Sequence, residues 1–112
     1  MGALTPGDRP DPAPGFDDAL ALLSDRARQR NAARAARLLE LLDAGGAPEP
    51  GARAEAVQLC HALAGSAGTF GDEALTDAAR HLEDVLRAED DSRTPDALER
   101  LRRAARPGGA GN

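Results

Sequence analysis

Residues 72–86, DEALTDAARHLEDVL, carry the clearest structural signal in the chain. Their apolar residues recur at spacings of three and four, which is the period of a helix with one buried face. Asp72 and Glu73 come first, where the partial positive charge of a helix N-terminus favours acidic side chains. We therefore predict an amphipathic helix, and its apolar face consists of Leu75, Ala78, Ala79, Leu82, Val85 and Leu86.

A longer helix is predicted near the beginning of the chain. It starts around Asp17 and stops before Gly45 and Gly46, because glycine commonly ends helices. Its middle is mostly Arg and Ala, which is compatible with a break or a bend near Asn31. The residues that fall near one apolar stripe of this helix are Leu20, Leu23, Ala27, Leu38 and Leu42.

Two more helices complete the set. One begins near Pro50, since proline suits the first turn of a helix, and ends at Gly68. The other has Thr94 as its cap and Pro95 in its first turn, and it ends before Pro107. Their apolar residues are Ala56, Leu59, Cys60, Leu63 and Ala67 in the former, and Leu98, Leu101, Ala104 and Ala105 in the latter. Four amphipathic helices with short connections predict an all-α fold, an antiparallel up-down four-helix bundle.

A single domain of 112 residues is expected, flanked by two tails. Residues 1–15 hold four of the eight prolines and residues 107–112 read PGGAGN, so we predict that both tails are disordered around a bundle of residues 16–106. A four-helix bundle closes its own core, so a monomer is expected. The weakly apolar middle of the first helix nevertheless leaves room for a dimer.

Charge and cysteine content exclude several classes of protein. The formal net charge is −5 and the arginines are not gathered on one surface, which argues against a nucleic-acid or membrane partner. The single Cys60 cannot form an internal disulfide, and with two histidines it is too little for a closed zinc site. No stretch has the apolar length of a signal peptide or a membrane span, so we expect a cytoplasmic protein.

His61 lies on the polar side of the helix that begins near Pro50. Successive helical residues advance by about 100°, which places His61 about 160° from Leu63 and facing water. Gly65, one turn later, costs about 1 kcal/mol relative to alanine inside a helix. The missing side chain would let another protein approach the ring, as a phosphorylatable histidine requires. The alternative is an exposed histidine without a role.

The run His61–Gly71, HALAGSAGTFG, followed by Leu75 and by the pair Leu82 and Glu83, resembles the histidine-containing phosphotransfer domain of bacterial multistep phosphorelays. The resemblance implies that His61 is the phosphoacceptor of a two-component signalling system. Its Nε2 would accept a phosphoryl group from a receiver-domain aspartate and pass it to another response regulator. The implied partners are receiver domains and a hybrid histidine kinase. The receiver would supply Mg²⁺, so no cofactor of its own is expected.

The implied chemistry is that of a phosphohistidine carrier without autokinase activity, because the chain has no room for an ATP-binding domain. One departure from the family pattern is Ala64, where relatives commonly have a lysine that is thought to steady the phosphoryl group. Gln58 and Ser66 are candidate neutral donors in its place. The departure also motivates an alternative, a docking module that is not phosphorylated and that binds and inhibits a receiver or a histidine kinase. The residues expected to dock the partner are Val57, Gln58, Ala64, Gly65 and Gly68.

Three residues near His61 receive structural interpretations. Cys60 is adjacent in sequence but diverges by about 100° around the helix, so it is expected to fill the core. His81 is expected at the border of its helix's apolar stripe, without a role. Glu83 is expected to form a surface ion pair with Arg80 or Arg87 at helical spacing.

Overall fold

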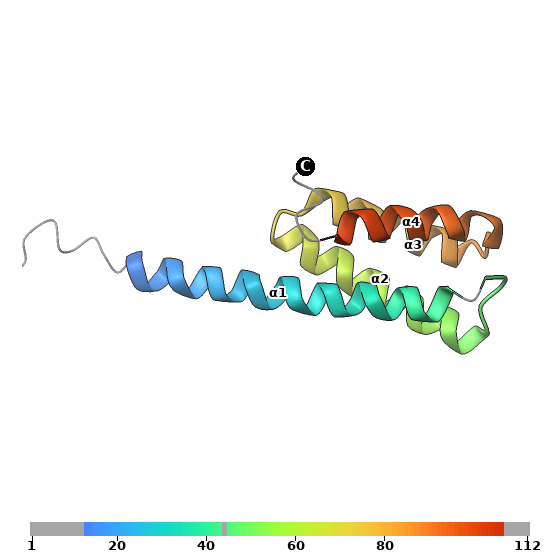
Figure 1. Ribbon diagram of the computed structural model, residues 1–112, viewed down its shortest axis with the longest axis horizontal. Coiled ribbons are helices and arrows are strands. Elements are labelled where there is room, and N and C mark those ends of the chain that lie inside the picture. Colours follow the sequence, from blue (N-terminus) through green and yellow to red (C-terminus); the bar gives the residue numbers. More distant parts are fainter. Residues whose placement is uncertain (1–12, 44, 107–112) are drawn as a thin grey trace, which may run out of the picture.

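The computed structural model describes residues 13–43 and 45–106. It contains α1 (Ala13–Leu42), α2 (Pro50–Thr69), α3 (Glu73–Arg87), a short 3₁₀ turn η1 (Asp91–Arg93) and α4 (Thr94–Ala105). Helix α1 packs against α2 and α4, and α3 packs against the same two helices, so the four form a closed antiparallel arrangement (Figure 1). The predicted all-α bundle is confirmed.

The core is built from small and medium side chains. Alanines on facing helices let the backbones approach closely, and leucines fill the space between them. The predicted apolar face of α3 is entirely buried, from Leu75 to Leu86. The largest fully buried side chains are Leu38, Leu63, Leu82, Leu86, Leu101 and Cys60.

Helix α1 runs without interruption through Asn31, so the bend or break that the sequence suggested there is absent. Asn31 is buried, and its side-chain amide donates to Ser66 Oγ on α2 at 3.1 Å. The side-chain oxygen Oδ1 of Asn31 accepts a hydrogen bond from Arg34 Nη1 at 2.8 Å. These hydrogen bonds satisfy the polar side chain inside the α1–α2 contact, and they keep the helix intact where its composition is weakest.

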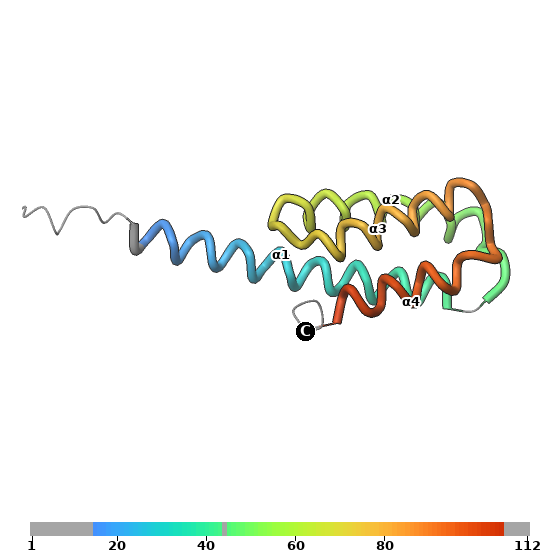
Figure 2. The backbone as a smooth tube through the Cα atoms, turned by 90° about the horizontal axis from the view of Figure 1, so that it is seen from above, coloured from blue at the N-terminus to red at the C-terminus, as the bar shows by residue number. Residues whose placement is uncertain are grey.

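The first half of α1 extends well beyond the other helices, as both views show (Figures 1 and 2). Leu20 and Leu23, predicted on the buried stripe, are 45% and 51% exposed, which corrects that prediction. The reason is length, since α1 has 30 residues and its neighbours α2 and α4 have 20 and 12. The helix also begins at Ala13, before the predicted start near Asp17, so residues 13–15 of the expected tail are helical. The rest of both predicted tails lies outside the described residues.

A tight turn joins α2 to α3 and orients the two helices. Gly71 adopts φ of 81°, a left-handed conformation that glycine reaches without strain. Asp72 then caps α3, because its carboxylate accepts a hydrogen bond from the backbone N–H of Leu75 at 3.1 Å. This turn reverses the chain and places α3 alongside α2.

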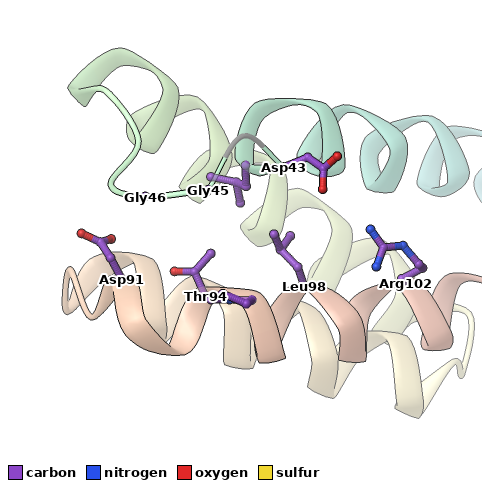
Figure 3. A pocket seen from close by; sticks show the side chains of 9 residues that line it. Asp43, Gly45, Gly46, Asp91, Thr94, Leu98 and Arg102 are labelled. Carbon is purple, nitrogen blue, oxygen red and sulfur yellow. The ribbon is translucent and has the colours of Figure 1, made fainter.

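The start of α4 differs from the prediction. Thr94 is the first helical residue rather than the cap, because η1 already leads the chain into the helix. Its Oγ1 is buried and makes no hydrogen bond to the described residues. Thr94 lies beside an open hollow of about 270 Å³ between α4 and the end of α1, with Asp43, Asp91 and Arg102 around it (Figure 3).

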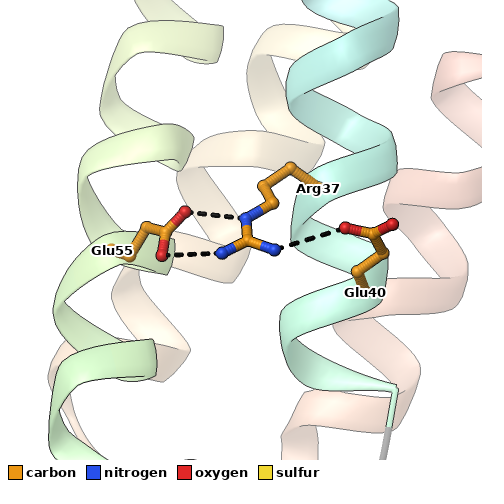
Figure 4. A network of polar contacts seen from close by, with 3 residues as sticks. All are labelled: Arg37, Glu40 and Glu55. Atoms are coloured by element: carbon orange, nitrogen blue, oxygen red, sulfur yellow. Dashed lines mark hydrogen bonds and ion pairs between the residues drawn. The ribbon is translucent and has the colours of Figure 1, made fainter.

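Two polar contacts tie α2 to its neighbours. Arg37 of α1 donates Nε and Nη2 to the carboxylate of Glu55 on α2 at 2.8 and 3.1 Å, and Nη1 to Glu40 at 3.3 Å (Figure 4). The hydrogen bonds from Arg37 lower the pKa of Glu55. Arg53, largely buried, donates to the Leu86 carbonyl at 3.0 Å and to Asp91 at 2.9 Å. These contacts fix the α2 backbone that carries His61.

Candidate functional site

The candidate site is the outer face of α2, centred on His61. The His61 side chain is 76% exposed, as the helical periodicity predicts. Its sequence neighbour Cys60 and the next apolar residue Leu63 are completely buried on the opposite side of the helix. The ring therefore stands on a helix whose opposite side is packed in the core, with most of its surface open to solvent.

Glu83 of α3 is the charged group that approaches the ring. Its Oε2 lies 3.6 Å from His61 Nδ1, and the carboxylate is only 12% exposed. This separation is longer than a hydrogen bond, but a small rotation of the exposed imidazole would close it. Arg87, one turn further along α3, donates Nε and Nη2 to the same oxygen at 3.0 and 2.7 Å. The predicted Glu83–Arg87 ion pair is confirmed, and the same carboxylate lies near Nδ1 of His61.

The surface beyond His61 is open because Gly65 has no side chain. A Cβ atom built at Gly65 meets nothing within 4 Å, so no contact inside the protein requires glycine there. At Gly68 a Cβ atom would lie 3.6 Å from Thr76 Oγ1, an ordinary contact distance. Both glycines are exposed. The packing of the bundle therefore does not account for the small residue one turn after the histidine.

The structure places the other predicted docking residues unequally. Gln58 is exposed, and Val57 is half-buried against the core. Ala64, by contrast, is only 5% exposed, which corrects its placement on the docking surface. It follows Cys60 by one turn and therefore shares the core side of α2. Its methyl group contributes packing, with little surface for a partner.

An open groove borders His61 on the side of the α2 N-terminus. It lies between the first half of α2 and the end of α3, and near the histidine it is lined by Val57, Gln58 and Arg87. Arg53, Leu86, Glu89 and Asp91 also line it. A partner that covers His61 could thus enter an existing depression whose lining includes both arginines and carboxylates.

Several neighbouring polar residues do not join the site. Ser66 accepts its hydrogen bond from Asn31 and so is engaged with α1, about 140° around α2 from His61. His81 is half-buried on α3, as expected. Burial raises the pKa of the Cys60 thiol to about 12, helped by the charge of Glu83, so this side chain stays neutral and fills the core as predicted.

Neither a cluster of metal-ligating side chains nor a membrane-spanning helix is found in the part of the chain described. Among residues 13–43 and 45–106, no three His, Cys, Asp or Glu side chains gather closely enough to hold a metal ion. None of the described helices combines the length and the apolar character needed to cross a bilayer.

A family comparison decides what this arrangement is. The family model of the Hpt domain matches residues 18–106, which include most of α1 and all of α2, α3 and α4. The chain belongs to the Hpt domain family. Membership gives the chain a role in histidine phosphotransfer within phosphorelays. No curated protein and no solved structure matches it.

Glu83 is the part of this Hpt site that sequence reasoning missed. Its pairing with Arg87 follows from helical spacing, but its approach to His61 depends on how α2 and α3 pack. A signal was present, because Glu83 directly follows the buried Leu82 and therefore lies at the edge of the α3 core face. This edge of α3 meets the neighbouring helix α2, which carries His61.

Proposed function

We propose that His61 is the phosphoacceptor and that its Nε2 exchanges a phosphoryl group with receiver-domain aspartates. One observation carries the proposal: the only histidine on α2 is largely exposed, beside a bare surface at Gly65 that the fold itself does not require. A hybrid histidine kinase would supply the phosphoryl group through its receiver, and a separate response regulator would take it. This exchange would belong to a bacterial two-component system in the cytoplasm.

The transfer step uses the lone pair of a neutral imidazole. His61 Nε2 attacks the phosphorus of the aspartyl phosphate while the P–O bond to the carboxylate breaks, and the aspartate leaves with the electron pair. A P–N bond forms, and Nδ1 keeps its proton. The reverse sequence delivers the phosphoryl group to the next receiver. The chain needs no cofactor of its own, since the receiver brings Mg²⁺ and most of the charge stabilisation.

Glu83 would act as a positioning residue in this step. A carboxylate beside Nδ1 favours the tautomer that carries its proton there, which leaves the Nε2 lone pair free and directed outward. The ring gains positive charge as the P–N bond forms, and the nearby negative charge offsets it. Arg87 holds the carboxylate in place through two hydrogen bonds. This arrangement works without a cation at Ala64, although the lysine common in the family would stabilise the phosphoryl group directly.

The docking surface would be the exposed outer side of α2 together with the groove. Gly65 and Gly68 allow the receiver backbone to come close to the ring, while Val57 and Gln58 provide contacts on the groove side. The groove carries two arginines and two carboxylates, Glu89 and Asp91, and Arg53 is paired with Asp91, so shape and apolar contact rather than net charge would favour the partner there.

The test is phosphotransfer from a panel of receiver domains that carry labelled phosphate. We expect label on the wild-type chain that is lost in acid and retained in base, and no label on His61→Gln. His81→Gln is the matched control, since it removes the other histidine and should leave labelling unchanged. Label that survives His61→Gln would overturn the proposal. Receiver binding without any label, unaffected by His61→Gln, would select the docking-module alternative instead.

A further inference from the structure

The projecting half of α1 carries an apolar stripe that no part of the described structure covers. Between Gly15 and Arg26 no side chain is buried, whereas Ala27 begins the buried part of the helix. Among the described residues, five large apolar side chains are strongly exposed. Four of them lie in a stretch of eight consecutive residues within this segment. They are Phe16, Leu20, Leu22 and Leu23. Such a concentration marks an interaction surface, since monomers rarely expose large contiguous apolar patches.

Three of these residues continue the core stripe of the bundle. With about 100° per residue, Phe16, Leu20 and Leu23 fall within about 40° of Ala27, which is where the stripe enters the core. Their spacings of four and three, continued by four more to Ala27, are those of a helix that packs against another helix. Leu22 lies about 130° from the centre of this stripe and is not part of it. The stripe is therefore shaped to receive one helix.

We propose that the projecting half of α1 is a dimerisation surface that pairs antiparallel with the same segment of a second copy. The antiparallel direction follows from the space that is available beside α1. Beyond Ala27 the same face of α1 is occupied by the chain's own α2 and α4, so a parallel partner helix would run into the bundle (Figure 2). An antiparallel partner leads away from it, and the two bundles lie at opposite ends of the helix pair.

Charge supports the same orientation. The beginning of α1 is acidic at Asp17 and Asp18, and its middle is net basic, with Arg26, Arg28 and Arg30 against Asp25, which pairs with Arg28. Antiparallel pairing brings the acidic turn of one chain beside the basic turns of the other, whereas parallel pairing would place like charges together. It also aligns the two helix dipoles favourably. A second copy thus supplies both the apolar face and the charges that this segment lacks.

The alignment of the two helices that buries the most apolar surface places Leu20 of each copy opposite Leu23 of the other. Phe16 then reaches the end of the partner's bundle at the α2–α3 turn. That turn carries Phe70, which is 43% exposed and completes the set of strongly exposed large apolar side chains among the described residues. The interface is isologous, so each chain contributes the same patch.

The size of this surface predicts a weak dimer. Twelve projecting residues span about 18 Å of helix, and one face is about 10 Å wide. Stable interfaces of standard size bury about 800 Å² on each partner. The helix pair alone offers less than this, so the dimer should dissociate on dilution into the low micromolar range.

Sedimentation equilibrium of the full chain over low to high micromolar concentrations tests the proposal. We expect a monomer–dimer equilibrium for the wild type, and for Leu23→Glu an association constant at least tenfold lower. Leu22→Glu is a closely matched control. It makes the same change one position away at an equal exposure, 50% against 51%, but off the stripe, so its association constant should stay within twofold of the wild type. Circular dichroism verifies that both variants keep their helices.

Two results would overturn the dimer. One is a wild-type chain that stays monomeric at every concentration, which together with slower phosphotransfer in Leu23→Glu would assign the stripe to a receiver domain. The other is equal weakening by Leu22→Glu and Leu23→Glu, which would show that the contact does not use this stripe. Neither result bears on His61, because phosphotransfer is measured separately.

Discussion

On its inner face α2 presents Ala56, Cys60, Leu63 and Ala67 to the core, each at most 1% exposed, while on its outer face it presents His61 and Gly65 to solvent. Both faces are rich in small residues, for different reasons. Inside, small side chains are required because α1 and α3 pack directly against them. Outside, nothing in the protein lies near Gly65. A small residue without a neighbour supports the proposal that the space is kept for a partner.

The largest effect should come from the inner face. Leu63→Ala leaves a cavity in a fully buried position and should lower the free energy of unfolding by about 2–5 kcal/mol. Denaturation in urea measures this. Gln58→Ala on the exposed side should change stability by less than about 0.5 kcal/mol. Similar losses in the two variants would contradict the division of α2 into a core face and a functional face.

Cys60, on the inner face of α2, should make the free energy of unfolding depend on pH. The thiol ionises near pH 8.5 in an unfolded chain, but burial raises its pKa to about 12 in the folded protein. The unfolded state therefore loses this proton first, and stability should fall by about 1.4 kcal/mol per pH unit between roughly pH 9 and 11.

The chain contains no Lys and no Tyr, so no other side chain ordinarily titrates in this range. Cys60→Ala should consequently make stability nearly independent of pH there, whatever its effect at neutral pH. Urea midpoints recorded at pH 8, 9, 10 and 11 provide the comparison, and an unchanged slope in Cys60→Ala would contradict a buried thiol.

Substitutions at Gly65 test the role of the outer face of α2. Gly65→Ala should raise the free energy of unfolding by about 0.5–1 kcal/mol, because alanine is the better helix former and open space surrounds the site. Gly65→Leu should fold equally well but slow phosphotransfer at least tenfold, since its side chain would stand beside the ring. Transfer at the wild-type rate by a stable Gly65→Leu would refute the idea that the space serves a partner.

The smallest effect concerns the tautomer of His61. Glu83→Ala should reduce the rate of transfer about threefold to tenfold and shift the neutral ring from the Nδ1–H toward the Nε2–H tautomer, which ¹⁵N chemical shifts report directly. Arg87→Ala is the control that removes the ion pair and keeps the carboxylate. A slower rate with an unchanged tautomer would assign Glu83 a merely structural role.

Periodicity predicted the features that depend on a single helix. The buried face of α3 and the exposure of His61 follow from about 100° per residue. The same period places Ala64 on the core side, but it was expected on the docking surface because the family pattern drew attention to that position. The resemblance to the family then supplied the chemistry proposed for the exposed histidine. Local sequence was sufficient here because each of these properties is set by the position of a residue around its own helix.

The features that were missed depend on two helices at once. The sequence suggested a break or bend in α1 at Asn31. The hydrogen-bond partner of its side chain, Ser66, is 35 positions away in the chain and so gives no local signal. Leu20 and Leu23 looked like core residues because the stripe does not reveal where the neighbouring helices end. Glu83 reaches His61 only through the packing of α3 on α2. Comparing helix lengths would have exposed the second error, since 30 residues cannot be covered by 20.

The most direct test of the account is to identify the phosphorylated atom. The chain, labelled with ¹⁵N in its histidine rings, is phosphorylated by a receiver domain and observed by NMR through the coupling between phosphorus and nitrogen. We expect one coupled nitrogen, Nε2 of His61, with His81 unchanged. Phosphorus on Nδ1, on His81 or on a residue other than histidine would contradict it.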